Sequence, residues 1–325
     1  MLSNFTKKYL KKFKNDKYSL SKSSYFMRYI YNEYINIINF INSTNFNVDI
    51  NIVNNITPIF NKYSQDAYFI MNKEVTAFNN HNLDTLLISY DDNNIYIKYD
   101  QETIKNKIVD RLLLLIKIIE YMKFKVKATK KFEIYLSLSN LTKYFPNNEI
   151  VNVKHINSGF TDHNKKIIYV WRYEEFEKVL IHEVIHYISF FQHDYDNIYI
   201  NHGISGKDLN FEAITDFWAI IYHSIYVSIY LNKSVRKILE FELGFIRNQA
   251  MIMNNYFDKY KRQKTNAYSY YILKYRLFDY IIKHDIIIDN NIINNDLLRN
   301  AVNQDFILYD YIDINSSRMT LFQLD

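Results

Sequence analysis

The hydrophobic pattern of the chain changes near residue 172, and this change limits the folds that the sequence can adopt. Before it, apolar and polar residues alternate at 86–90 and 95–99, around a turn at 91–94, as in a β-hairpin. Three more runs are strand-like: 132–138, 150–154 and 166–171. After residue 172 the apolar residues recur at helical spacing. The helical segments are 174–191, 209–231, 234–256, 265–283 and 296–303. This order predicts an α+β protein with an N-terminal mixed sheet lobe and a C-terminal, mainly helical lobe.

Helical spacing also marks three segments of the N-terminal part: 24–43, 52–71 and 102–123. Pro58 stands near the start of the second, where proline is tolerated. We expect three successive domains along the chain. Residues 1–80 form a helical segment with a basic tail, 81–192 a sheet lobe ending in one long helix, and 193–325 a helical lobe.

The composition excludes one kind of metal site. The 325 residues include no cysteine, so disulfides and cysteine-bound zinc are both impossible. Any metal ligands must come from His, Asp or Glu. The chain is rich in Asn, Ile, Lys and Tyr and has only 4 Gly and 2 Pro. This bias is typical of an AT-rich genome, such as that of a large DNA virus, so the tyrosine content indicates little about function.

The charge gives little support to a nucleic-acid or membrane function. The net charge is +5, with many lysines before residue 23. They could contact nucleic acid, but a solvated face explains them better, so a nucleic-acid partner is not expected. The apolar runs 112–119 and 217–230 contain Lys117 and His223 and are too short to span a membrane. With no secretory signal either, we expect a soluble protein of the cytoplasm or a virion.

The motif that carries chemistry is His182–Glu183–Val184–Ile185–His186, in the predicted helix 174–191. Two histidines four residues apart lie on one face of a helix and can bind the same zinc ion. Glu183 is placed to accept a proton from metal-bound water as general base. A core helix with two hydrogen-bonded histidines would show the same spacing.

An acidic pair that follows the two histidines could supply the third ligand that catalytic zinc requires. Glu212 and Asp216 are four residues apart in the next predicted helix, among apolar residues. Glu212 is the expected ligand, and Asp216 is expected to hold a ligand histidine through its other ring nitrogen. Another known continuation of the motif needs a glycine and then a histidine at the positions where this chain has Ser189 and Gln192. Four residues of the connecting segment remain alternative ligands: Asp194, Asp196, His202 and Asp208.

The two motifs together resemble the gluzincin zinc metallopeptidases, which include thermolysin-like enzymes and oligopeptidases. The resemblance covers about residues 166–217. It implies a zincin-like fold, in which the active-site helix lies between a sheet lobe and a helical lobe that carries the third ligand. It also implies Zn²⁺ as cofactor and a peptide or protein as substrate. The edge strand of the sheet lobe borders the cleft in that fold, and 167–170 could bind an extended peptide by strand addition.

In the resembled families a tyrosine or histidine of the helical lobe stabilises the oxyanion. Tyr270, Tyr271 and His223 are the residues here that could do so. Packing explains any one tyrosine better, because the chain has 31 of them. The expected activity is therefore peptide-bond hydrolysis by zinc-activated water. The alternative is a structural or interaction protein that keeps the zincin fold without turnover.

Overall fold

A computed structural model describes residues 2–12, 14, 18–53, 56–66, 72–81, 84–91, 93–99, 105–146, 149–190, 207–260, 262–288, 293–304, 311–312 and 314–324. The chain forms two compact units. The first, here called the sheet unit, comprises Ile37–Lys143 and Asn157–Phe190. The second, the helical unit, comprises Met1–Asn36, Tyr144–Ile156 and Phe191–Leu324. Each unit is thus assembled from segments that are far apart in the sequence, whereas the pattern predicted three successive domains.

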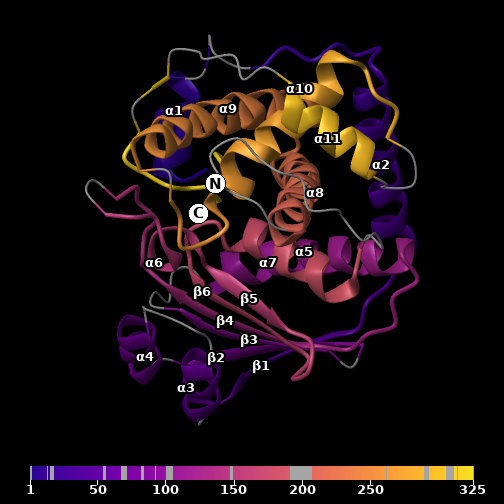
Figure 1. Ribbon diagram of the computed structural model, residues 1–325. Coiled ribbons are helices and arrows are strands. Elements are labelled where there is room, and N and C mark those ends of the chain that lie inside the picture. The colour runs from indigo at the N-terminus through magenta and orange to yellow at the C-terminus, as the bar shows by residue number, and fades with distance from the viewer. Residues whose placement is uncertain are drawn as a thin grey trace. The chain divides into compact units, whose positions relative to one another are not determined.

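The sheet unit contains a six-stranded mixed sheet in the order β1-β2-β3-β4-β6-β5 (Figure 1). Its strands are β1 Val48–Val53, β2 Thr85–Tyr90, β3 Asn93–Tyr99, β4 Glu133–Ser139, β5 Gly159–Asp162 and β6 Ile167–Arg172. β1, β2 and β3 pair antiparallel, β3, β4 and β6 pair parallel, and β5 is antiparallel to β6. β6 is buried along its whole length, as expected for an interior strand with helices on both faces.

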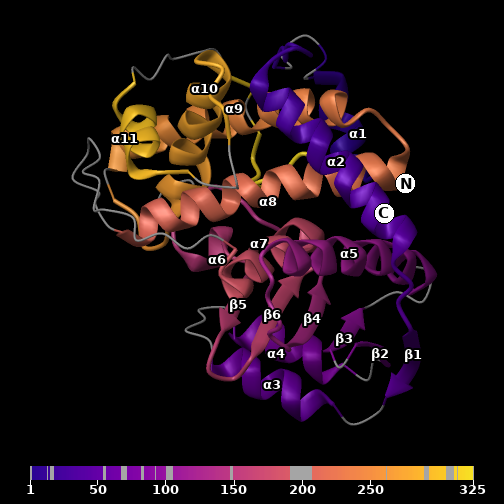
Figure 2. The ribbon, with the colours of Figure 1, turned by 90° about the vertical axis from the view of Figure 1, so that its right-hand side faces the viewer.

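Helices cover both faces of this sheet. Figures 1 and 2 show α5 (Lys105–Lys125) and α7 (Phe176–Ile188) on one face, and α3 (Thr57–Asp66) and α4 (Asn72–Asn80) on the other. On the α3 and α4 face, a core cluster joins both helices to β4 and β6: Phe60, Val75, Tyr135, Ile167, Tyr169 and Trp171. The β3–α5–β4 connection supplies the helical crossover that two parallel strands need.

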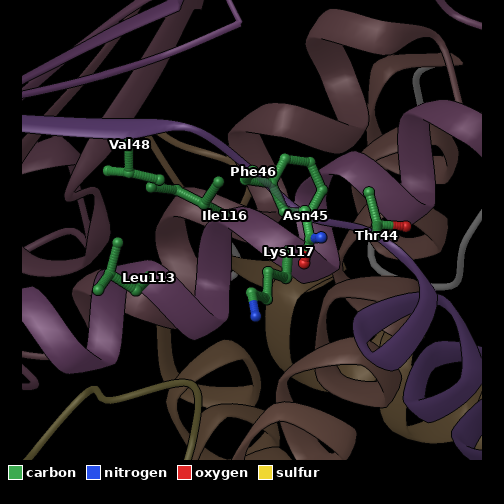
Figure 3. Close-up of a pocket in the computed structure, with 7 residues that line it drawn as sticks. All are labelled: Thr44, Asn45, Phe46, Val48, Leu113, Ile116 and Lys117. Atoms are coloured by element: carbon green, nitrogen blue, oxygen red, sulfur yellow. The ribbon is translucent and has the colours of Figure 1, made fainter.

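The sheet unit also has a pocket of about 340 Å³ beside α5 (Figure 3). In Figure 3, Val48, Leu113 and Ile116 lie on the left, Phe46, Asn45 and Lys117 near the middle and Thr44 on the right. None of the residues that line this pocket belongs to the His–Glu motif. The pocket therefore gives no information about the predicted chemistry.

The helical unit is built around α8 (Lys207–Leu231), which contacts α9 (Val235–Tyr260), a π-helix η2 (Ser269–Leu273) and α10 (Lys274–Lys283). The remaining helices are α1 Asn4–Lys12, α6 Val153–Ile156, α11 Asn295–Asn303 and α2 Tyr25–Ser43, whose last residues belong to the sheet unit. The middle of α8 is buried all round, including Ile214, Phe217 and Trp218. This confirms the apolar helix expected from the sequence.

An extended segment near the C-terminus runs through the core of the helical unit. Residues 316–324 are buried. The Gln249 amide donates to the carbonyl groups of Ser316 and Arg318 at 2.9 and 2.7 Å. The Glu242 carboxylate accepts a hydrogen bond from the backbone N–H of Leu321. These side chains satisfy backbone groups that have no partner in a regular strand or helix.

The α+β prediction is confirmed, with the six-stranded mixed sheet and eleven α-helices among the described residues. Two segments were predicted wrongly. Residues 52 and 53 end β1 instead of starting a helix, and residues 153 and 154 begin the short helix α6 instead of ending a strand. β5 was not predicted at all. Among the described residues, no helix has both the length and the apolar character that crossing a membrane requires.

Candidate metal centre

Helix α7 carries both histidines of the motif. Its apolar residues, such as Leu180 and Val184, are buried, and the helix contacts β5, β6 and α5. His182 and His186 lie one turn apart, and their Nε2 atoms are 3.0 Å from each other. The sequence spacing therefore brings the two imidazoles together as predicted.

This separation suits a metal ion. Tetrahedral zinc, with bonds of about 2.0–2.1 Å to nitrogen, holds two ligand nitrogens roughly 3.3 Å apart. The observed 3.0 Å is close to that value. It also matches a hydrogen bond in which one ring N–H donates to the other ring. The same geometry thus serves a metal-bound pair and a metal-free pair.

Two buried ion pairs fix the first turn of α7. Lys143 Nζ lies 2.9 Å from Glu175 Oε2, and Arg111 Nε donates to Glu177 Oε1 at 2.7 Å. Burial lowers the pKa of Lys143, and the negative charge of Glu175 opposes this shift. Glu175 has a φ of 62°, a conformation that costs free energy for any residue except glycine. The surrounding ion pairs hold the start of α7 in this conformation.

Glu183 is oriented by the neighbouring strand β5. The Thr161 hydroxyl lies 2.9 Å from Glu183 Oε2 and 2.9 Å from the Glu183 carbonyl oxygen. Gly159, at the start of β5, lets the strand approach the helix closely. A Cβ atom there would lie 2.8 Å from Val179 Cγ1 and 3.1 Å from Glu183 Oε1. The Glu183 side chain is therefore held in one orientation beside the histidine pair.

His163 lies near the pair, in the turn between β5 and β6. Its ring stacks on Tyr187 with the centroids 5.4 Å apart. Burial lowers the pKa of His163, and the positive charge of Lys130 lowers it further. Both effects favour the uncharged imidazole. Near neutral pH, His163 therefore adds no positive charge to the surroundings of the pair.

The helical unit holds the two predicted carboxylates on α8. Tyr270 Oη donates to Glu212 Oε2 at 3.1 Å, and Lys274 Nζ donates to Asp216 Oδ2 at 2.6 Å. The second contact is a buried ion pair, in which neither side chain is more than 1% exposed. The structure thus pairs Asp216 with a lysine of its own unit. The expected contact of Asp216 with a ligand histidine stays a prediction.

The other predicted oxyanion donors are placed differently. The Tyr271 hydroxyl donates to the carbonyl oxygen of Ser317 and is buried. That proton is thus already used within the core. His223 is buried on α8 beside Thr320, eleven residues after Glu212. Eleven residues of helix span roughly 16 Å, so His223 and Glu212 cannot touch the same substrate carbonyl. Of the three residues, Tyr270 is the one whose hydroxyl donates to Glu212.

One strand prediction needs correction. β6, which contains residues 167–170, lies between β4 and β5 and offers no free edge. The outer strand on this side is β5. Of the alternative ligands, Asp194, Asp196 and His202 lie outside the described residues. Only the backbone of Asp208 is described, in the first turn of α8.

Three residues of the site were missed in the sequence. Thr161 gave no signal, because β5 is four residues long and follows a turn-like segment. Gly159 could be noticed only as one of 4 glycines in the chain. Lys274 is 58 residues from Asp216, and no periodicity links two positions so far apart.

Comparisons of the chain with protein-family models, with curated proteins and with solved structures found no match.

Proposed function

We propose that the chain is a zinc-dependent peptidase in which His182, His186 and Glu212 bind one zinc ion and Glu183 is the general base. The proposal includes a zincin-like arrangement, in which the histidine pair of the sheet unit faces Glu212 of the helical unit. One observation carries it: the two Nε2 atoms are 3.0 Å apart, beside a carboxylate that β5 already orients. His182, His186 and Glu212 also form a donor set that could hold one metal ion.

The donor chemistry fits zinc. Two neutral imidazoles and one carboxylate are a ligand set of catalytic zinc sites, which keep one position open for water. Bound zinc lowers the pKa of that water and polarises a carbonyl group. Thr161 fixes one carboxylate oxygen of Glu183 at 2.9 Å, and this orients the group as a base. Glu183 would take a proton from the water and pass it to the leaving amine.

A peptide is the substrate that best suits the sheet unit. β5 is the outer strand beside α7, and an extended peptide can pair with the free edge of such a strand. Backbone hydrogen bonds would hold any peptide sequence. We therefore assign peptide binding to β5, in place of residues 167–170.

Metal analysis of the purified protein, combined with three substitutions at the site and one control substitution, tests this function. We expect one zinc ion per chain in the wild type and a loss of zinc in His182→Ala and Glu212→Gln. Glu183→Gln should keep zinc but lose roughly 100- to 10,000-fold in peptide cleavage. Glu74→Gln, at an exposed position of α4, is the matched control and should keep both. Zinc binding that does not depend on Glu212 would exclude the proposed ligand set.

The alternative is a protein that keeps the fold without turnover. The 3.0 Å contact favours it in one respect, because two neutral histidines can make that contact as a hydrogen bond without any metal. A wild-type protein that contains no zinc and cleaves no member of a peptide library would support this alternative.

A further inference from the structure

Two carboxylates of α8 meet two donors of the η2–α10 segment at matching intervals. Glu212 and Asp216 are four residues apart, and so are their partners Tyr270 and Lys274. Each partner follows its carboxylate by 58 residues. Residues four apart lie on one face of a helix, so the contacts form two successive rungs between the two helical segments.

The two rungs differ in their exposure. The inner rung is fully buried, because Lys274 is 1% and Asp216 0% exposed. The outer rung is partly open, because Glu212 is only half-buried. A buried ion pair with a contact of 2.6 Å resists displacement, since separating it would leave a charge in the core. The inner rung therefore fixes the position of the outer rung.

The π-helix directs its two tyrosines to different partners. Tyr270 and Tyr271 both lie in η2, whose wider turn changes the directions of successive side chains. Tyr270 reaches Glu212, and Tyr271 reaches the carbonyl oxygen of Ser317. Single-turn π-helices are frequent at functional sites. This one brings a hydroxyl group to the residue that the proposed function makes a metal ligand.

We infer that Tyr270 is a positioning residue for the ligand carboxylate of Glu212, and that the Lys274–Asp216 pair holds it in place. This inference rests on the proposed function and deepens it. The Tyr270 hydroxyl, donating to Oε2, prevents rotation of the carboxylate before a metal arrives. This positioning role differs from oxyanion stabilisation. The Tyr270 hydroxyl acts on the metal-ligand carboxylate of Glu212, and it does so without a bound substrate.

Zinc affinity, measured by competition with a chelator in the full-length protein, tests the outer rung. Loss of a group that orients a ligand typically weakens metal binding by about 10- to 100-fold, and we expect that increase in Kd for Tyr270→Phe. Tyr271→Phe is the matched control. It removes the neighbouring hydroxyl of the same π-helix and should leave the Kd for zinc unchanged.

The inner rung needs a variant that still folds. Lys274→Met alone would leave the Asp216 charge buried, so the variant to use is the double substitution Lys274→Met with Asp216→Asn. We expect it to fold, as checked by its circular dichroism, and to weaken zinc binding as Tyr270→Phe does. If the double variant folds and binds zinc like the wild type, the inner rung has no positioning role. If it does not fold, Tyr270→Phe decides the inference alone.

Failure of the inference is distinct from failure of the proposed function. If the wild type binds no zinc, the proposed function and the positioning inference are both wrong. If Glu212→Gln loses zinc while Tyr270→Phe binds it like the wild type, only the positioning role is overturned. A Tyr270→Phe variant with a lower kcat but unchanged zinc affinity would assign Tyr270 to the oxyanion and overturn positioning.

Discussion

Helices α7 and α8 both carry candidate ligands, but they are supported in different ways. α7 presents two imidazoles that contact each other, and its carboxylate is oriented by a threonine 22 residues away. α8 presents two carboxylates whose partners are both 58 residues away. Neutral side chains can be buried with local support, whereas the fully buried carboxylate of Asp216 needs its cation, Lys274. The acidic half of the proposed site therefore depends on long-range packing, and the histidine half on packing within one sheet.

The chain allows the two units to be observed separately. It contains two tryptophans, and both are buried: Trp171 on β6 of the sheet unit and Trp218 on α8 of the helical unit. In a Trp218→Phe background, fluorescence reports on the sheet unit, and in a Trp171→Phe background it reports on the helical unit. Each substitution below can thus be assigned to one unit.

The largest expected decrease in stability comes from breaking the Lys143–Glu175 ion pair at the start of α7. Lys143→Met leaves Glu175 charged and buried, which should lower the free energy of unfolding of the sheet unit by about 3–5 kcal/mol. Denaturant unfolding followed through Trp171 measures this. The double variant Lys143→Met with Glu175→Gln removes both charges and should recover much of the loss. If Trp218 reports an equal shift, the two units unfold together and the comparison of separate units fails.

Alkaline pH should weaken the sheet unit next. Burial raises the pKa of Tyr169 on β6 to about 12. In the unfolded chain tyrosine loses its proton near pH 10. The folded state thus keeps a proton that the unfolded state has lost, and stability falls as the pH rises from about 10 to about 12. The loss is on the order of 2–3 kcal/mol. It is measured by denaturant unfolding at a series of pH values.

Tyr169→Phe is the control for this effect. It lacks the titrating hydroxyl, so its stability should fall less than that of the wild type over the same pH range. An identical pH dependence in the variant would show that Tyr169 does not contribute. Tyr90 of β2, whose pKa is also raised by burial, would then be the tyrosine to substitute.

Adding a methyl group between β5 and α7 should have a moderate effect. Gly159→Ala places a Cβ atom 2.8 Å from Val179 Cγ1, so strand and helix must separate. Such overpacking typically costs about 1–3 kcal/mol. Adding Val179→Ala makes room, so the two losses should be less than additive in the double variant. Strictly additive losses in unfolding followed through Trp171 would show that the contact with Val179 does not cause the loss in Gly159→Ala.

The smallest expected change in stability comes from Thr161→Val, which removes the hydroxyl bound to Glu183. One hydrogen bond contributes about 1 kcal/mol to folding, so the sheet unit should remain folded. Peptide cleavage should decrease, because Glu183 can then rotate away from the histidine pair. Thr161→Ser keeps the hydroxyl and should keep the activity. Equal cleavage rates for the Val and Ser variants would show that Glu183 needs no orientation from β5.

The sequence predicted the parts of the site that depend on local spacing. His182, Glu183 and His186 could be recognised because a single helix brings them together. The hairpin β2–β3 was equally clear, since its strands alternate around a short turn. The α+β class followed from the change of pattern near residue 172. In each case, the residues that interact are near neighbours along the chain.

What the sequence did not predict depends on contacts between distant segments. Tyr270 was predicted as one of three possible oxyanion donors, and its contact with Glu212 required the packing of η2 on α8. β5 was hidden because its first residue, Gly159, belongs to a segment typical of turns. Because β5 was overlooked, β6 was taken for the edge strand. In the structure β5 pairs with β6, and the outer strand on this side is β5. Strand order depends on pairing that no single segment encodes.

The buried segment at 316–324 sets an order for folding during synthesis. The backbone N–H of Ser3 donates to the carbonyl oxygen of Gln323 at 2.9 Å, so two residues far apart in the sequence pair within the helical unit. The sheet unit is complete once residue 190 has emerged, whereas the helical unit needs residue 324. At typical translation rates this gap lasts on the order of ten seconds. A nascent chain would thus hold the histidine helix in place well before the acidic helix acquires its final surroundings.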